Sequence, residues 1–156
     1  MKLNFYFIGL AVVMLFTIAV TGCSNEGNSK GNSFVINFEI KLEETMIEVQ
    51  QRVGEVNEYK SFKEIEIEEQ LESVMDILND TTWENAEVQM EQPPHYKFSF
   101  INKGSGEEIE TFLVWVTPTK DRLEVVRDKG GYTKLTKENS DVLFEILTGN
   151  KLSASQ

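Results

Sequence analysis

The sequence predicts an α+β domain in which two amphipathic helices cover one face or one end of an antiparallel sheet of about five to six strands. Three observations predict it: stretches of alternating apolar and polar residues, two stretches with helical spacing of apolar residues, and short links rich in Gly, Pro and Asp. Alternation is typical of strands with one buried face, whereas recurrence every three or four residues is typical of helices. The predicted single domain spans residues 34–150 of the 156.

The N-terminal part of the predicted domain holds two strands and a helix. Residues 34–42 alternate and predict a strand with Phe34, Ile36, Phe38, Ile40 and Leu42 on one face, and residues 46–53 alternate less cleanly and are expected to pair with it. Residues 54–61 are polar and predict a loop. A helix ending near Asn79-Asp80 follows from an apolar stripe that comprises Ile67, Leu71, Val74, Met75 and Leu78.

The C-terminal part predicts a meander of antiparallel strands. Residues 88–90 indicate a short strand that ends before two prolines, and residues 96–100 indicate the next one. Residues 109–117 are apolar on both faces, which is typical of a central strand, and residues 121–127 return beside them. The links between these stretches contain Gly or Pro, as turns do.

A second helix closes the predicted domain. Thr136 is expected at its N-cap, because a threonine oxygen can accept from the free N–H groups of the first turn, and Gly149 is expected at its end. Residues 151–156 are predicted to be a frayed tail. The apolar stripe of this helix comprises Val142, Leu143, Ile146 and Leu147.

The N-terminus has the pattern of an export signal. Lys2 is followed by residues 5–20, which carry no charge, and then by the small residues Thr21 and Gly22. A basic start, an apolar run and a small-residue end predict a secretory signal peptide over residues 1–22. The alternative is a single membrane-spanning helix, but no basic stop-transfer cluster follows the apolar run.

Val20-Thr21-Gly22-Cys23 resembles the lipobox of bacterial lipoproteins. The resemblance implies a covalent diacylglycerol on Cys23 and cleavage between Gly22 and Cys23, since stable anchoring needs more than one acyl chain. Residues 23–33 would then be the lipidated cysteine and a flexible tether rich in Ser, Asn and Gly. We therefore expect a protein anchored to the cell membrane and facing the extracellular side, unless Cys23 is a chance thiol.

Composition restricts the remaining function classes. The formal net charge is −11, and removal of the signal peptide makes it more negative, which disfavours nucleic acid as a partner. Cys23 is the one cysteine and His95 the one histidine, so a disulfide, a cysteine zinc site and a multi-histidine metal site are excluded within this sequence. No metal and no cofactor besides the diacylglycerol are expected.

Several aromatic and proline positions form a recognisable pattern: Trp83, Pro94-x-Tyr96, Val114-Trp115-Val116 and Tyr132-x-x-Leu135. This pattern resembles the YhfM-like domain, which occurs in small lipoproteins of Bacillus-type bacteria. The resemblance covers residues 34–149 and implies no catalytic residue, because the family has no established activity. His95 stands where such domains often have an acid.

Charge is distributed unevenly along the predicted domain. Residues 39–76 carry twelve acids and four bases, which suggests calcium binding, a basic partner or simply a solvated face. No Gly-containing calcium loop is present, so the solvated face is preferred. Residues 120–137 carry six bases and three acids, which could meet an anionic wall polymer or lipid headgroups, or could complement the acidic residues 39–76.

The most distinctive local sequence is Pro93-Pro94-His95-Tyr96. It is a candidate recognition loop, because proline fixes φ and can present an aromatic ring at low entropic cost. The structural alternative is a strand break after which Tyr96 re-enters the core. Trp115 is expected in the core, and Trp83 either in the core or at a contact surface.

These observations favour a non-catalytic binding or accessory module of the cell envelope, with an envelope protein as a possible partner. The sequence contains no Gly-rich phosphate loop, no G-x-S-x-G elbow and no H-E-x-x-H motif. The alternative is a small envelope hydrolase that uses carboxylates near His95. A third possibility is a purely structural lipoprotein.

Overall fold

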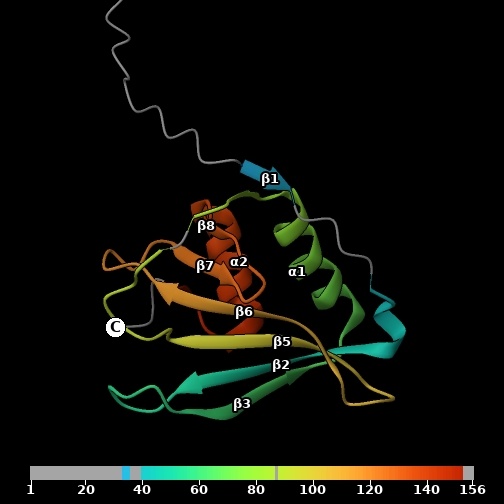
Figure 1. The fold of residues 1–156 in the computed structure, drawn as a ribbon. Helices are drawn as coiled ribbons and strands as arrows, with labels where there is room; N and C mark the ends of the chain where they lie inside the picture. Colours follow the sequence, from blue (N-terminus) through green and yellow to red (C-terminus); the bar gives the residue numbers. More distant parts are fainter. Residues whose placement is uncertain (1–32, 36–39, 87, 153–156) are drawn as a thin grey trace, which may run out of the picture.

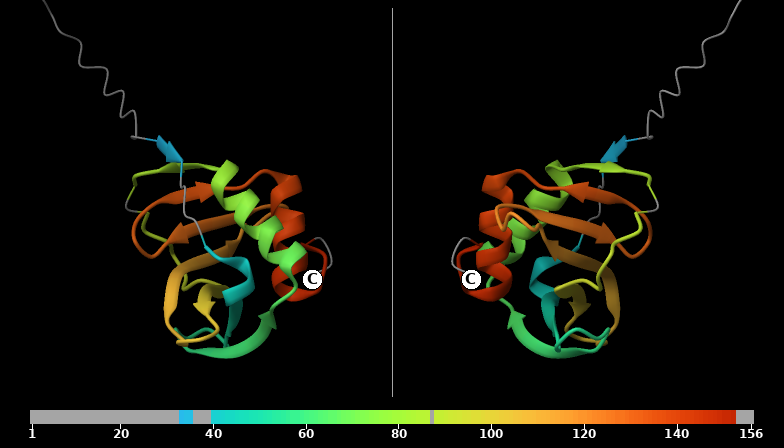
Figure 2. Two further views of the ribbon diagram at one scale, coloured as in Figure 1. Left: turned by 90° about the vertical axis from the view of Figure 1, so that its right-hand side faces the viewer. Right: turned by 90° about the vertical axis from the view of Figure 1, so that its left-hand side faces the viewer.

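Eight strands form one antiparallel sheet, and both α-helices pack on the same face of it (Figures 1 and 2). The computed structural model describes residues 33–35, 40–86 and 88–152. The lipobox and residues 24–32 of the predicted tether lie outside this range. No helix among the described residues is long and apolar enough to cross a bilayer.

The strand order is β1-β4-β8-β7-β6-β5-β2-β3, and all neighbours are antiparallel. The helices are a 3-10 turn η1 (Leu42–Glu44), α1 (Glu68–Asp80) and α2 (Lys137–Thr148). The strands are β1 (Ser33–Val35), β2 (Thr45–Arg52), β3 (Tyr59–Ile65), β4 (Thr82–Glu84), β5 (Tyr96–Asn102), β6 (Glu108–Val116), β7 (Leu123–Arg127) and β8 (Tyr132–Lys134).

The α+β class, the antiparallel sheet and the two helices are confirmed, but the expected number of five to six strands is too low. The predicted meander is present as β5 to β8. The β2–β3 hairpin extends it beyond β5, and α1 then leads the chain to β4 near the opposite edge. Consequently the link from β4 back to β5 must pass β8, β7 and β6.

The core lies between the helices and the inner face of the sheet. Strand alternation directs the side chains of Phe98 on β5 and Phe112 on β6 to this face, where their rings stack with centroids 5.0 Å apart. Trp83 of β4 packs against Phe112 and donates from Nε1 to Leu78 O of α1 at 3.0 Å. Burial of each such side chain contributes about 1.5–3 kcal/mol.

Both helices are present near the predicted positions, but the set of buried residues in each differs from the prediction. Ile67 is 58% exposed because its extended backbone forms the N-cap of α1, and Ile77 is buried instead. In α2, Val142 is 46% exposed and Phe144 takes a buried place. The predicted caps are confirmed: Thr136 Oγ1 accepts from Asn139 N at 3.2 Å, and Gly149 has φ 75°.

The β3 edge curls toward the helices (Figure 2). Lys63 of β3 donates from Nζ to Ile146 O in the last turn of α2 at 2.7 Å. A cation at this position satisfies a carbonyl group that has no partner within the helix and interacts favourably with the helix dipole.

Three predictions about the edge strands differ from the structure. Within residues 34–42, where one strand is predicted, the structure has the end of β1 and, at Leu42, the start of η1, and residues 36–39 lie outside the described range. Its expected pairing with residues 46–53 is wrong, because β1 pairs with β4 while β2 pairs with β3 and β5. The predicted loop 54–61 is too long, because β3 already begins at Tyr59. A β-bulge at Phe62 interrupts the alternation of β3 and hides it in the sequence.

Two further predictions fail because of tertiary contacts. Residues 88–90, which are expected to form a strand, have no regular secondary structure. They cross the outer face of the sheet, where Val88 and Met90 line a cavity. The domain also continues past residue 150, since Leu152 is fully buried in the core, and residues 153–156 lie outside the described range.

Replacing Gly131 by Ala should destabilise the protein more than replacing Gly130 by Ala. Both glycines have positive φ (126° and 98°), so each substitution costs about 1–3 kcal/mol in backbone strain. At Gly131 the new Cβ would also lie 3.0 Å from Phe34 Cζ and 3.3 Å from Trp83 Cε3, which adds about 1–3 kcal/mol. Urea unfolding followed by circular dichroism measures both, and equal losses would contradict this packing.

Candidate functional site

The segment from Gln92 to His95 is held to the sheet by its carbonyl groups. Pro93 and Pro94 have no N–H, so this segment cannot pair with a neighbouring strand as a regular strand would. Its carbonyl groups therefore need donors that are not part of a strand ladder. The donors are side chains of three strands: Trp115 Nε1 donates to Gln92 O (2.7 Å), Arg52 Nη1 to Pro93 O (2.7 Å) and Tyr59 Oη to Pro94 O (2.8 Å). The segment is therefore fixed in position, as expected of a rigid loop.

His95 is bound through its backbone and its ring between the ends of β2 and β6. Its N–H donates to Val114 O at 2.9 Å, and its carbonyl accepts from Arg52 N at 3.0 Å. Its ring Nδ1 accepts from Val116 N at 3.2 Å, so the neutral ring carries its proton on Nε2. Burial, and secondarily the charge of Arg52, hold the pKa of His95 below its usual 6.5.

Tyr96 starts β5 and turns its ring toward α2. It meets Phe144 edge-to-face at a centroid distance of 5.9 Å, and the ring of Phe62 of β3 meets it at a centroid distance of 6.0 Å. Its hydroxyl accepts from Gln51 Nε2 at 3.5 Å, and burial raises the pKa of Tyr96 despite this bond. The expected return of Tyr96 to the core is thus only partial, because the ring also lines a cavity.

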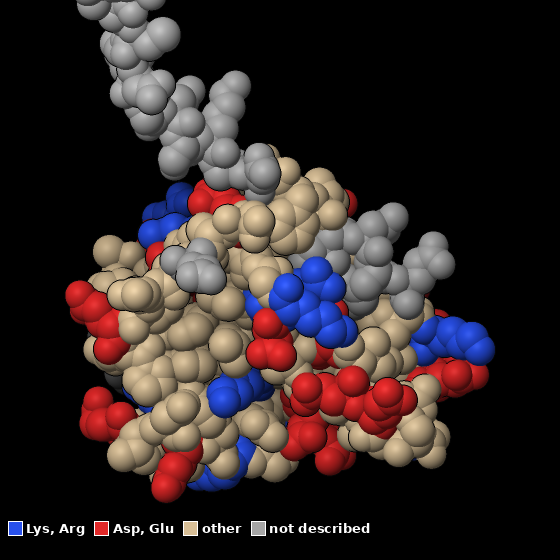
Figure 3. All heavy atoms as spheres, in the orientation of Figure 1, with Lys and Arg blue, Asp and Glu red and all other residues tan. Residues whose placement is uncertain are grey.

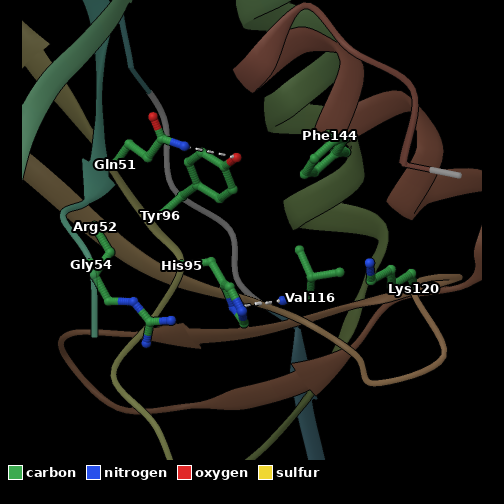
Figure 4. A pocket seen from close by; sticks show the side chains of 8 residues that line it. All are labelled: Gln51, Arg52, Gly54, His95, Tyr96, Val116, Lys120 and Phe144. Atoms are coloured by element: carbon green, nitrogen blue, oxygen red, sulfur yellow. Dashed lines mark hydrogen bonds between the residues drawn. The ribbon is translucent and has the colours of Figure 1, made fainter. Parts of the chain in front are cut away.

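That cavity, which we call the end pocket, has a volume of about 350 Å³. Its lining residues are Gln51, Arg52, Gly54, His95, Tyr96, Val116, Lys120 and Phe144. Figure 4 shows Tyr96 and Phe144 on one side of the pocket and His95, Val116 and Lys120 on the other. Ends of three strands, the turn after β6 and one helix face thus meet at a single concave site.

Lys120 reaches the end pocket from a backbone conformation that favours glycine. Its φ is 53°, the one positive φ of a non-glycine residue among those described. The turn around it is held by the Lys120 N to Thr117 O bond of 2.8 Å and by the ion pair of 2.7 Å between Asp121 and Lys137 of α2. Hydrogen bonds from Lys137 and then Thr119 lower the pKa of Asp121 to about 2.

Two further cavities continue from the end pocket onto the outer face of the sheet. The first, of about 430 Å³, shares His95, Val116 and Lys120 with the end pocket. The second, of about 410 Å³, shares Trp115 and residues 90–92 with the first. Charged side chains surround an area of this face that carries few charges (Figure 3). The two outer cavities together form one groove along residues 88–95, and this groove adjoins the end pocket at His95, Val116 and Lys120.

The carboxylates near His95 belong to the groove and not to the end pocket. Glu91 and Glu124 line the cavity of about 430 Å³, and Glu124 forms an ion pair with Lys134 at 3.3 Å. None of the eight residues of the end pocket is acidic. Within the part of the chain that the structure describes, no group of three or more His, Cys, Asp or Glu side chains is placed to hold a metal.

Bases of residues 120–137 form ion pairs with acids of the same half of the domain. Arg127 and Lys129 both contact Oε2 of the buried Glu110, at 2.8 and 3.3 Å. Lys134 and Lys137 are paired with Glu124 and Asp121 as described above. Four of the six bases of this stretch are thus paired with Glu110, Asp121 and Glu124, and the partners of these four are not among the acids of residues 39–76.

The structure brings together the four residues of the predicted recognition loop, while Gly22 and Cys23 lie outside the described range. Pro93 and Pro94 act as the anchored frame, and His95 and Tyr96 line the end pocket. The sequence did not reveal Arg52, Gln51, Lys120 or Phe144 as site residues. Nothing in their local sequences shows that they meet, because they are separated by up to 93 positions. Trp83 and Trp115 are both buried.

Protonation of His95 should make the protein less stable as the pH falls. Since the folded state lowers the pKa of His95, the unfolded chain binds the proton first, so this part of the stability is complete above about pH 6.5 and declines below it. Replacing His95 by Asn keeps an acceptor for Val116 N but removes the titration. Urea unfolding between pH 7.5 and pH 5 should show a steeper loss for wild type, and parallel profiles would contradict the assignment.

Replacing Lys120 by Gly should stabilise the protein, whereas Lys120→Ala should not. Glycine adopts φ near 53° without steric cost, which is worth about 1 kcal/mol relative to a residue with a Cβ. Thermal unfolding of the two variants measures the difference. A destabilised glycine variant would mean that the Lys120 side chain contributes more to folding than its backbone costs.

Comparison with known proteins places the chain in a family. Searches among curated proteins and among solved structures find no match. A family model described as YhfM protein matches residues 41–153, which include every strand from β2 onward, both α-helices and all eight residues of the end pocket. The match covers well over half of the chain and extends the similarity noted in the sequence, so this chain belongs to the YhfM protein family.

Proposed function

We propose that this protein is a membrane-anchored, extracytoplasmic lipoprotein whose domain is a non-catalytic binding or accessory module of the cell envelope. The lipobox at Val20–Cys23 supports the anchor, with a diacylglycerol on Cys23 and residues 1–22 removed. The uncharged run before it and the polar tether after it support export and display on the extracellular side of the membrane.

The observation that carries the binding role is the end pocket. Its frame is fixed by side-chain hydrogen bonds to three consecutive carbonyl groups, and it presents both polar groups and aromatic rings. A preformed concave site with a few convergent polar groups is the usual form of a ligand site. The last residue of the predicted tether, Ser33, begins β1 at one edge of the sheet, whereas the pocket lies at the ends of β2, β5 and β6.

The second candidate is a small envelope hydrolase, and the groove beside the end pocket provides one observation in its favour. Glu91, Glu124 and His95 line the same cavity, so a carboxylate and an imidazole could act on one substrate. Against it, the imidazole already accepts Val116 N at Nδ1, and Glu124 already pairs with Lys134. Binding without catalysis is therefore the preferred function.

Replacing Cys23 by Ala should block lipidation and the cleavage between Gly22 and Cys23. In the native host, the wild type should partition into the membrane fraction, lack residues 1–22 and carry the mass of a lipid adduct. The variant should keep its N-terminus and carry no lipid. Fractionation and intact mass spectrometry of both proteins provide the measurement, with Ser24→Ala as the matched control.

The opposite result would overturn the anchor. If wild type and Cys23→Ala both keep the full N-terminus and remain in the membrane, residues 5–20 are a spanning helix and Cys23 is incidental.

A further inference from the structure

The polar groups of the end pocket are donors and cations. Arg52, His95 and Lys120 follow one another along one side of it, with His95 between the two cations, and Gln51 and the hydroxyl of Tyr96 lie on another side. None of the lining residues is a carboxylate, although acids outnumber bases by 26 to 15 in the chain. A concave site with this composition is complementary to negative charge.

The hydrogen bonds within the frame leave further donors on the same side chains. His95 uses Nδ1 as the acceptor for Val116 N, so its Nε2 is the proton-bearing atom. Arg52 uses Nη1 to bind Pro93 O, and a guanidinium has five N–H groups, so it can hold the loop and bind an anion together. Tyr96 accepts from Gln51, which leaves its own O–H as a donor.

Lys120 supplies a second, independent indication. Its backbone adopts a conformation in which glycine is favoured, and the adjacent Asp121 is tied to α2 by Lys137. A residue that retains a long cationic side chain at such a position is often found at a functional site. In this protein the side chain lines the same pocket as Arg52 and His95 (Figure 4).

The remaining walls of the pocket are apolar. The ring of Tyr96 meets Phe144 of α2 edge-to-face, and Val116 lies across from them. A hydrated inorganic ion would leave these surfaces unused, whereas an organic anion can place its charged group near the cations and its body on the rings.

We infer that the end pocket binds the anionic group, a carboxylate or a phosphate, of a small organic ligand whose apolar body packs against Tyr96 and Phe144. This inference rests on the proposed binding function and names its ligand class. The negative net charge of the protein makes general attraction of anions unfavourable, so selective binding of an anion must arise locally, at the pocket.

The test compares three probes of similar shape: benzoate, phenyl phosphate and the neutral benzamide. The full chain is held in nanodiscs of zwitterionic lipid, in a low-salt buffer free of phosphate and carboxylates. His95 is the one histidine, so its ring signals in a ¹H–¹³C NMR spectrum report on the pocket without further assignment. We expect the anions to shift these signals with dissociation constants on the order of 1 mM, at least several-fold tighter than benzamide.

Variants locate the charge that is responsible. Lys120→Ala should weaken benzoate binding about fivefold, while Lys120→Arg should retain most of it. Lys41→Ala is the matched control, because Lys41 is an exposed lysine at the far end of β2 whose ion pair with Glu44 spans 3.4 Å. Circular dichroism confirms that each variant is folded. A tighter complex with phenyl phosphate assigns the natural group as a phosphate, and a tighter complex with benzoate assigns a carboxylate.

The outcomes separate the two proposals. If benzamide binds as tightly as benzoate, or if Lys120→Ala behaves like Lys41→Ala, the anion assignment is overturned while the pocket remains a binding site. If none of the three probes shifts the His95 signals, both the anion assignment and the use of this pocket for small ligands are overturned. The result with Cys23→Ala is independent of these measurements and tests the anchor alone.

Discussion

The hydrogen bonds that hold the carbonyls of residues 92–94 are the interaction on which the candidate site depends. The sheet order places three strands between β4 and β5, so the chain has to cross the outer face to connect them. Two prolines on this path cannot pair as a strand would, and buried carbonyls without partners would destabilise the fold. Trp115, Arg52 and Tyr59 remove that cost and, in doing so, fix His95 and Tyr96.

The two faces of the sheet consequently differ in what they can do. The inner face is filled by aromatic and aliphatic side chains under α1 and α2, and it leaves little freedom for a ligand. Residues 88–94 cross the outer face, and the groove follows their path. Its position also explains why β6 is apolar on both sides, since Trp115 is buried under the crossing segment. The end pocket lies where the groove reaches α2.

The interior elements could be predicted because their signals are local. Residues of β2, β5, β6 and β7 and of both helices are buried on one or two faces, and burial imposes a period of two or of three to four on the sequence. The edges could not be predicted in the same way. β1 and β4 are three residues long, and the bulge at Phe62 interrupts the alternation of β3. At residues 88–90, alternation is present without a neighbouring strand to pair with.

The sequence by itself determined the fold class, the two helices with their caps at Thr136 and Gly149, the family resemblance and the distinctive Pro93–Tyr96 loop. Only the tertiary structure decided the strand order, the burial of Leu152 and the composition of the end pocket. The physical reason is the distance along the chain over which each effect acts. Propensity, capping and periodicity act over a few residues, whereas the pocket joins side chains from residue 51 to residue 144, and their meeting depends on strand pairings whose free energy is shared over the whole sheet.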